Sequence, residues 1–223
     1  MTQPDFQRAR SPQAKQQRQA AILNAARSLA VENGVSGVTL TDIADAVSMH
    51  KSAMLRYFET REEIFLLLAT EAWQEWSATL SNDLGNLGAV GTAEVAEAIA
   101  GTLASRGLFC DLLAQTPLHL ERNVSLSAVR EYKLITLAEV DRVVSAIRGP
   151  LPLLTELNAV DVVATATSVA GTFWHIATPG PDVAALYRSD PRLAHAVIEI
   201  RPRLTRILTA LLDGMTSTPA QRH

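Results

Sequence analysis

Apolar residues near the C-terminal end of the chain recur at the spacing of an α-helix that packs against other helices. Their separations are 4, 3, 4, 3 and 4 residues along Leu193, Val197, Ile200, Leu204, Ile207 and Leu211, and Leu208 and Leu212 widen the stripe. Asp190 and Pro191 are typical of an N-cap followed by proline at the first helical position. The pattern predicts one helix from 190 to about 213, kinked near Ile198 by Pro202, that buries a seam in a helical bundle.

The composition favours the same class of fold. Aromatic residues make up 5% of the 223 residues, whereas all hydrophobic residues together make up 48%, which is enough for a sizeable core. The single cysteine, Cys110, excludes an intrachain disulfide and a cysteine metal cluster. The five histidines have no metal-binding spacing, so we expect neither a metal ion nor another cofactor. The sequence therefore predicts an all-α chain.

Two segments bear on where the protein resides. Residues 1–19 are polar and basic, without the apolar centre of a secretory signal peptide. Residues 162–178 are the best candidate for a membrane span, but they include threonines, a serine and His175 and are followed by Pro179. We interpret this segment as a buried helix and expect a cytoplasmic protein that has no membrane partner.

The apolar pattern predicts short helices in the first 60 residues and longer ones after them. The first helix carries Ile22, Ala26, Leu29 and Ala30 and stops at Gly34. Thr39 caps a short second helix, and a third runs from His50 or Lys51 to Phe58. Later helices are expected from Thr60 to about Asn82, over 93–105, over 107–116 until Pro117, from Ser125 to Gly149, and over 158–178, with a linker at 83–92.

The chain accordingly divides into four parts. We expect a flexible N-terminal arm over 1–13, a helical head over 14–60, a helical body over 61–214 and a flexible tail over 215–223. Residues 1–61 contain eight Lys or Arg and five Asp or Glu, a balance of +3, and because the whole chain sums to −3, the remainder carries −6. A basic head on an acidic body suggests that only the head approaches a polyanion such as DNA.

Residues 39–58 have the layout of a helix-turn-helix, in which the second of two short helices enters the major groove. Ile43, Ala44, Val47, Met49, Met54 and Phe58 are expected to hold the unit together. The capped helix start offers backbone N–H groups to phosphate, and side chains on the outer face read the bases. The candidate DNA-binding residues are Thr39, Thr41, His50, Lys51, Ser52, Ala53, Arg56, Tyr57 and Arg61. The alternative is an ordinary helical hairpin whose Lys and Arg side chains are solvated.

The order of residues favours the DNA-binding interpretation. Thr39-x-x-x-Ile43-Ala44, then Tyr57-Phe58 and Thr60-Arg61-Glu62-Glu63-Ile64, resembles the DNA-binding domain of the TetR family of transcriptional regulators. The spacing is kept without gaps over about 25 residues. Val47, Ser48, Met49 and His50 stand where the family usually has Ala, Gly, Val and Ser, Met54 and Leu55 replace Leu and Tyr, and Arg61 replaces Lys. Ser48 must therefore tolerate a turn conformation that glycine reaches more easily.

The resemblance implies a helical ligand-binding and dimerisation domain in the body. The last two long helices would form a four-helix bundle across a two-fold axis, although a core helix within one chain would show the same stripe. The positions expected at the dimer interface are Ala164, Ala170, Gly171, Leu204, Ile207 and Leu211. A dimer would also pair two heads with the two half-sites of a palindromic operator in double-stranded DNA.

A set of mostly apolar body residues has the composition of a small-molecule cavity, although core packing is an alternative for each of them. The candidate ligand-binding residues are Trp76, Phe109, Cys110, Leu113, His119, Tyr132, Phe173, Trp174 and His175. We expect a largely apolar effector and, by resemblance to the family, a repressor that the effector releases from DNA. Activation by the ligand, or no ligand at all, remains open.

Two other classes of protein are weighed against this expectation. An enzyme is disfavoured, because the chain has no G-x-S-x-G, H-E-x-x-H, phosphate-loop or dinucleotide-binding motif. A helical adaptor that binds protein partners without specific DNA binding is the main alternative, but it leaves the basic, capped helix pair at 39–58 without a role. Specific binding to DNA separates the adaptor from the regulator.

Overall fold

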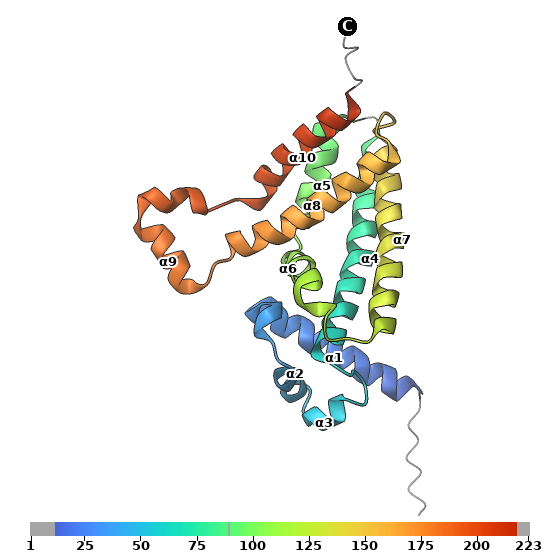
Figure 1. The fold of residues 1–223 in the computed structure, drawn as a ribbon, viewed down its shortest axis with the longest axis vertical. Coiled ribbons are helices and arrows are strands. Elements are labelled where there is room, and N and C mark those ends of the chain that lie inside the picture. The colour runs from blue at the N-terminus through green and yellow to red at the C-terminus, as the bar shows by residue number, and fades with distance from the viewer. Residues whose placement is uncertain (1–11, 89, 218–223) are drawn as a thin grey trace, which may run out of the picture.

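The structure is a computed structural model that describes residues 12–88 and 90–217, and every regular element in these ranges is helical (Figure 1). In chain order the elements are α1 (Pro12–Asn33), η1 (Val35–Gly37), α2 (Leu40–Ala46), α3 (Lys51–Met54), α4 (Arg61–Leu87), α5 (Thr92–Ala104), α6 (Gly107–Gln115), η2 (Thr116–Leu120), α7 (Leu126–Arg148), α8 (Glu156–Ala177), α9 (Pro181–Ser189), η3 (Pro191–Ala196) and α10 (Ile200–Thr216). The predicted all-α class is confirmed. No helix in the described ranges is long and apolar enough to cross a membrane.

Helices α1, α2 and α3 form a small unit at one end of the molecule (Figure 1). Ile22 and Ala26 of α1 are buried together with Ile43, Met54 and Phe58 from the segments that follow. Their four-residue spacing within α1 places Ile22 and Ala26 on one face of that helix, as the periodicity predicts.

Helix α4 belongs to both parts of the molecule. Thr60 caps it by accepting a hydrogen bond from the Glu63 N–H at 3.1 Å, and Glu62 and Glu63 lie in the first turn, where the helix dipole favours acids. From there α4 runs beside α7 through the body (Figure 1). Its buried face includes Phe65 near the head and Trp76 deep in the body. The head is therefore attached to the body through a continuous helix.

The rest of the body is built from helix pairs. Helix α5 packs along α10, and α6 packs along α8. Helix α7 contributes Glu139, which is buried against α4, where it accepts a hydrogen bond from Ser77 and pairs with Arg142 at 3.0 Å. A buried carboxylate is tolerated there because it has both a hydrogen-bond donor and a cation as partners.

The prediction of one kinked helix from 190 to 213 is wrong. Asp190 does act as a cap, accepting from the Arg192 N–H at 3.0 Å, but it begins only the short η3 turn. Val197 and Glu199 are extended, and α10 begins after them. Pro202 lies in the first turn of α10, where a missing N–H costs no helical hydrogen bond. Proline therefore sits at the start of this helix, and α9 was not anticipated.

Other predicted boundaries also differ. Helix α4 continues to Leu87, through the first half of the predicted linker, because Gly85 is tolerated inside the helix. Pro117 does not end the helical segment that begins with α6, because it lies within the π-helical turn η2 that continues α6. The third helix ends at Met54, and single turns lead on to Phe58, whose N–H donates to Met54 O at 3.1 Å.

The sequence predicts a flexible arm over 1–13 and a flexible tail over 215–223. Residues 1–11 of the arm and 218–223 of the tail lie outside the described residues. Pro12 and Gln13 belong to α1, and Met215 and Thr216 belong to α10, so these four residues are helical.

Candidate nucleic-acid interface and ligand groove

The N-terminal end of α2 is closed by reciprocal hydrogen bonds between Thr39 and Asp42. The Asp42 N–H donates to Thr39 Oγ1 at 3.2 Å, and the Thr39 hydroxyl and N–H each donate to Asp42 Oδ2 at 2.7 Å. The bond from the hydroxyl, and then that from the N–H, hold the pKa of the Asp42 carboxyl below its ordinary value of 3.8. The cap predicted at Thr39 is confirmed, and its reciprocal hydrogen bonds with Asp42 form a capping box.

The turn between α2 and α3 depends on Ser48. This residue has φ of 54°, the left-handed conformation that glycine adopts more easily. The reversal lets the Met49 N–H donate to Ala44 O at 2.9 Å, which closes the turn against the end of α2. The expectation of a glycine-like turn at Ser48 is confirmed, and the turn sets how α3 leaves α2.

The expected outer face of the unit is largely open to solvent. Ala53 and Tyr57 are half-buried, whereas the exposed candidates are Thr39, Thr41, His50, Lys51, Ser52 and Arg56. Leu55, which stands where the family usually has Tyr, is 51% exposed. Met54 and Phe58 point into the core, together with Ile43 and Ala44, and Val47 and Met49 pack beside them. A short basic helix is thus presented on an apolar base.

Arg61 was expected among the DNA-binding residues, but its side chain makes its contacts within the chain. Its guanidinium donates to the backbone carbonyls of Val35 and Val38 and lies 4.6 Å from the centre of the Phe65 ring. These contacts use the side chain to hold the segment around η1 against the start of α4. The Thr39 hydroxyl is also not free to donate to a phosphate, because its proton is already donated to Asp42.

A groove of about 1010 Å³ lies between the head and the body. It is bounded by the C-terminal half of α1, the middle of α4, the start of α6, the end of α8 and the start of α9. Arg27 and Glu71 form an ion pair at 2.5 Å in its wall, joining α1 to α4. The contents of this groove would therefore touch both parts of the molecule.

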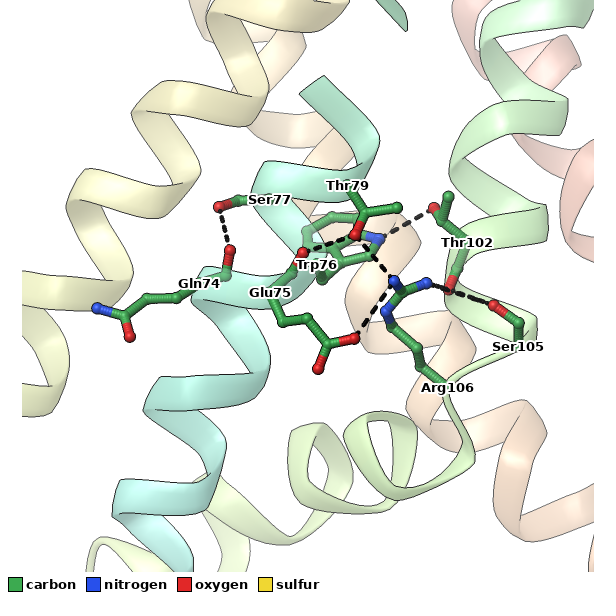
Figure 2. Close-up of polar contacts among 8 residues, drawn as sticks. All are labelled: Gln74, Glu75, Trp76, Ser77, Thr79, Thr102, Ser105 and Arg106. Carbon is green, nitrogen blue, oxygen red and sulfur yellow. Dashed lines mark hydrogen bonds and ion pairs between the residues drawn. The ribbon is translucent and has the colours of Figure 1, made fainter. Parts of the chain in front are cut away.

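Arg106, just before α6, ties the groove wall to the body (Figure 2). Its guanidinium donates to Thr79 Oγ1 at 3.0 Å and to Thr102 O at 2.9 Å, and it lies 3.5 Å from Glu75 Oε1. In the same cluster the Trp76 Nε1–H donates to Thr102 Oγ1 at 3.0 Å. These bonds hold the α5–α6 connection against α4.

Asp111 occupies a central place in the groove. Its side chain comes from α6 and the residue is only 4% exposed. Oδ2 accepts a hydrogen bond from the Val35 N–H of η1 at 2.7 Å, and Oδ1 lies 3.2 Å from His175 Nε2 on α8. One carboxylate thus contacts the head, the body and the groove.

The predicted ligand-binding residues do not all meet in this groove. Phe109, Trp174 and His175 line it, whereas the other six do not. Trp76 is fully buried, Tyr132 is buried on α7, Leu113 packs against the core, and Phe173 lies 5.2 Å from the Arg203 guanidinium. Cys110 is buried and donates to Leu103 O at 3.3 Å, and exposed His119 lines a smaller pocket of about 370 Å³. Core packing, the alternative considered for each, describes Trp76, Cys110 and Tyr132.

Several groove residues were missed. Arg27, Glu71, Arg106 and Asp111 line the groove, and none was among the candidates. A usable signal existed for Asp111, because it is the only charged residue in the apolar segment Gly107-Leu108-Phe109-Cys110-Asp111-Leu112-Leu113. An acid amid residues bound for the core needs a special partner. Arg27 and Glu71 carry no such signal, since charged residues on helix surfaces are ordinary.

The residues expected at a dimer interface fall into two groups. Ala170, Gly171 and Leu204 are buried inside the single chain, and a Cβ built on Gly171 would lie 3.1 Å from Cys110 O of α6. They therefore present no surface to a second copy, which corrects the expectation for these three. Ala164 is exposed, and Ile207 and Leu211 are half-buried.

Family comparisons cover nearly the whole chain. Residues 22–68 match the family described as bacterial regulatory proteins, tetR family. Residues 70–219 match the family described as the tetracyclin repressor-like, C-terminal domain. No curated protein is similar enough in sequence to count as a match.

Solved structures agree in fold at low sequence identity. The fatty acid degradation regulator FadR from Bacillus halodurans has a TM-score of 0.56 and 13% identity, covering 87% of this chain and 98% of that one. The multidrug binding protein EbrR, complexed with imidazole, has a TM-score of 0.55 and 15% identity, with 92% and 98% covered. RolR in complex with resorcinol has a TM-score of 0.51 and 16% identity, with 89% and 96% covered. At these identities the likeness concerns the fold alone.

Proposed function

The chain belongs to the TetR family of DNA-binding transcriptional regulators, and on that premise we propose that it is a repressor that a small ligand releases from its operator. The operator is a palindrome in double-stranded DNA, and the repressor binds it as a homodimer in the cytoplasm. Members of the family are transcription factors and not enzymes.

The observation that carries the DNA-binding part is the exposed basic segment 50–58, which includes α3. His50, Lys51, Ser52 and Arg56 are exposed, whereas Met54 and Phe58 anchor this segment in the core. A short helix presented in this way fits the major groove, and its cations neutralise phosphates on either side. Leu55 can contact a thymine methyl group.

The homodimer is supported by apolar side chains on the outer surfaces of α8 and α10. Leu157 is 72% exposed and Val160 is 37% exposed, and Ala164 follows them on the same side of α8. Ile207 and Leu211 of α10 are half-buried. Two such surfaces facing each other across a two-fold axis would form a four-helix bundle and hold two heads at the spacing of two half-sites.

Ligand release is supported by the position of the groove between head and body. A ligand that binds best to one arrangement of α1 against α4 and α6 shifts the population toward that arrangement. If that arrangement misplaces the heads, the dimer no longer fits both half-sites. EbrR and RolR are solved with imidazole and resorcinol, which are small organic molecules.

The test is selection of bound fragments from genomic DNA of the source, followed by a salt titration on the best fragment. The proposal expects recovery of a short palindrome that is bound specifically, with affinity falling as salt rises. Weak binding that is equal for all fragments and lost at moderate salt would overturn it. That result would favour a helical adaptor that binds protein partners.

A further inference from the structure

The ionisable side chains that line the groove carry more negative than positive charge. The acids are Glu32, Glu71, Glu75 and Asp111, and the bases that stay charged near neutral pH are Arg27 and Arg106. Arg27 pairs with Glu71 at 2.5 Å and Arg106 pairs with Glu75 at 3.5 Å. With the His175 imidazole neutral, the excess of two negative charges therefore resides on Glu32 and Asp111, and a site with this field concentrates cations.

Asp111 differs from Glu32 in its burial. Glu32 is exposed to water, whereas Asp111 is only 4% exposed. Oδ2 of Asp111 is held by the Val35 N–H, whereas Oδ1 has no aligned hydrogen-bond donor among the described residues and faces His175 Nε2 at 3.2 Å, an ion pair only when that imidazole is protonated. A buried carboxylate oxygen without an aligned donor is costly, so a ligand that brings a well-placed, charged N–H donor gains that free energy when the imidazole is neutral.

Aromatic side chains lie in the same groove. Trp174 of α8 is half-buried in the groove and lies over the start of α6, whereas Phe109 of α6 reaches the groove wall but is only 3% exposed and packs against Trp73 and Trp76. A Cβ on Gly107 would fall 2.1 Å from the Trp174 ring, so only glycine allows this approach. Aromatic faces attract both flat apolar groups and cations.

We propose that the groove binds a ligand with an aromatic body and one cationic nitrogen, and that the nitrogen donates to Asp111 Oδ1. This inference rests on the proposed function, because it names the chemical class of the effector for that groove. The same carboxylate holds the Val35 N–H that follows α1, so a ligand that moves Asp111 also moves the segment leading to α2. Asp111 is thus both the counter-ion of the ligand and its connection to the head.

The first experiment compares three probes by isothermal titration calorimetry with the full chain near neutral pH. The probes are 1-naphthylmethylammonium, its neutral analogue 1-naphthylmethanol, and the anion 1-naphthylacetate. We expect the cation to bind about tenfold or more tightly than the alcohol, and the anion to bind most weakly. Equal binding of cation and alcohol, or tighter binding of the anion, would overturn the inference without any variant being needed.

The second experiment uses Asp111→Asn, which keeps an acceptor for the Val35 N–H and removes the charge. Binding of the cation should fall about tenfold or more while binding of the alcohol stays within about twofold. Glu32→Gln is the matched control, because it removes the same charge from the same groove at an exposed position, and it should weaken the cation by about threefold or less. Equal losses in the two variants would point to the general field and not to a contact with Asp111. Thermal unfolding confirms that both variants are folded.

A gel shift with the selected operator separates this inference from the proposed function. If the alcohol or the anion releases DNA while the cation does not, the function stands and the ligand class is wrong. If no fragment is bound specifically, the proposed function fails, while calorimetry still decides the ligand class.

Discussion

Ser48 holds a left-handed backbone conformation at the turn that sets the direction of α3. For a residue with a Cβ this conformation costs about 1 kcal/mol or more, whereas glycine adopts it freely but loses more entropy on folding. We expect Ser48→Gly to raise the free energy of unfolding by about 0.5 kcal/mol, and Ser48→Val to lower it by more than about 1 kcal/mol. Urea denaturation measures both. Destabilisation by glycine would mean that the serine side chain contributes something that its conformation alone does not explain.

Cys110 is a buried thiol without reactive character. Burial, and then the charge of Asp111, raise its pKa from 9.0 to about 12. At mildly alkaline pH the thiolate fraction is therefore about a thousandfold lower than for an exposed cysteine. We expect iodoacetamide to label the folded protein at least that much more slowly than the protein in urea. Comparable rates in the two states would show that the thiol is accessible in the folded protein.

Lys51 and Leu55 are expected to contribute differently to DNA binding. If Lys51 neutralises one phosphate, Lys51→Ala flattens the slope of log affinity against log salt by about one unit.

If Leu55 packs on a thymine methyl group, Leu55→Ala changes the preference among half-site sequences and leaves that slope unchanged. Titrations on the selected operator and on variants of it measure both quantities. An equal loss on every sequence for Leu55→Ala would contradict its role in base recognition.

At the scale of the element, the start of α2 depends on its cap. Thr39→Ala removes the acceptor for the Asp42 N–H and should lower the free energy of unfolding by about 1 kcal/mol. Thr41→Ala is the matched control, since Thr41 is an exposed threonine inside the same helix, and its effect should stay within about 0.5 kcal/mol. Equal effects of the two substitutions would mean that the cap contributes nothing specific.

The same cap makes the stability of α2 depend on pH. Because the folded state lowers the pKa of Asp42 below 3.8, its ionised carboxyl stabilises the fold above that pH. The contribution is lost as pH falls through the folded-state pKa. We expect the stability difference between the wild type and Asp42→Asn to be largest near neutral pH and to vanish well below 3.8. A difference that persists in strong acid would mean that the charge is not what the cap uses.

Helices α9 and α10 show how far periodicity reaches at this scale. The apolar spacing from Leu193 to Leu211 is that of one continuous helix, and within α10 it does identify Leu204 and Leu208 as buried residues. It does not reveal that Val197 and Glu199 are extended. An apolar stripe shows which side chains prefer to be buried. The extended break directly follows η3, in which no described residue is buried, so packing does not hold a helix there.

At the scale of the whole molecule, the proposed dimer makes its own prediction. Ala164 is exposed on α8, so Ala164→Arg places a charge in the proposed interface without disturbing the core of the subunit. We expect sedimentation velocity to show a shift from dimer to monomer, together with weaker operator binding, because one head contacts only one half-site. Ala138→Arg makes the same change at an exposed position of α7 and should leave the dimer intact. If Ala164→Arg remains dimeric, this side of α8 is not the interface.

The sequence by itself determined the elements whose causes are local. The cap at Thr39, the turn at Ser48, the start of α4 at Thr60 and the apolar faces of α1 and α2 follow from hydrogen bonds and spacings within a few residues. The family pattern over 39–64 is a set of such local requirements, which is why the helix-turn-helix was identified from the sequence.

Only the tertiary structure decided which residues meet across long separations in the chain. Asp111 lies beside Val35 and His175, and Arg61 turns its guanidinium to the carbonyls around η1, because α4 and α6 pack against the head and α8 packs against α6. The stripe on α10 could face its own subunit or a partner, and packing against α5 turned Leu204 inward. Apolar surface stabilises any arrangement that buries it, so the choice among arrangements depends on the fit of whole helices, which no local pattern contains.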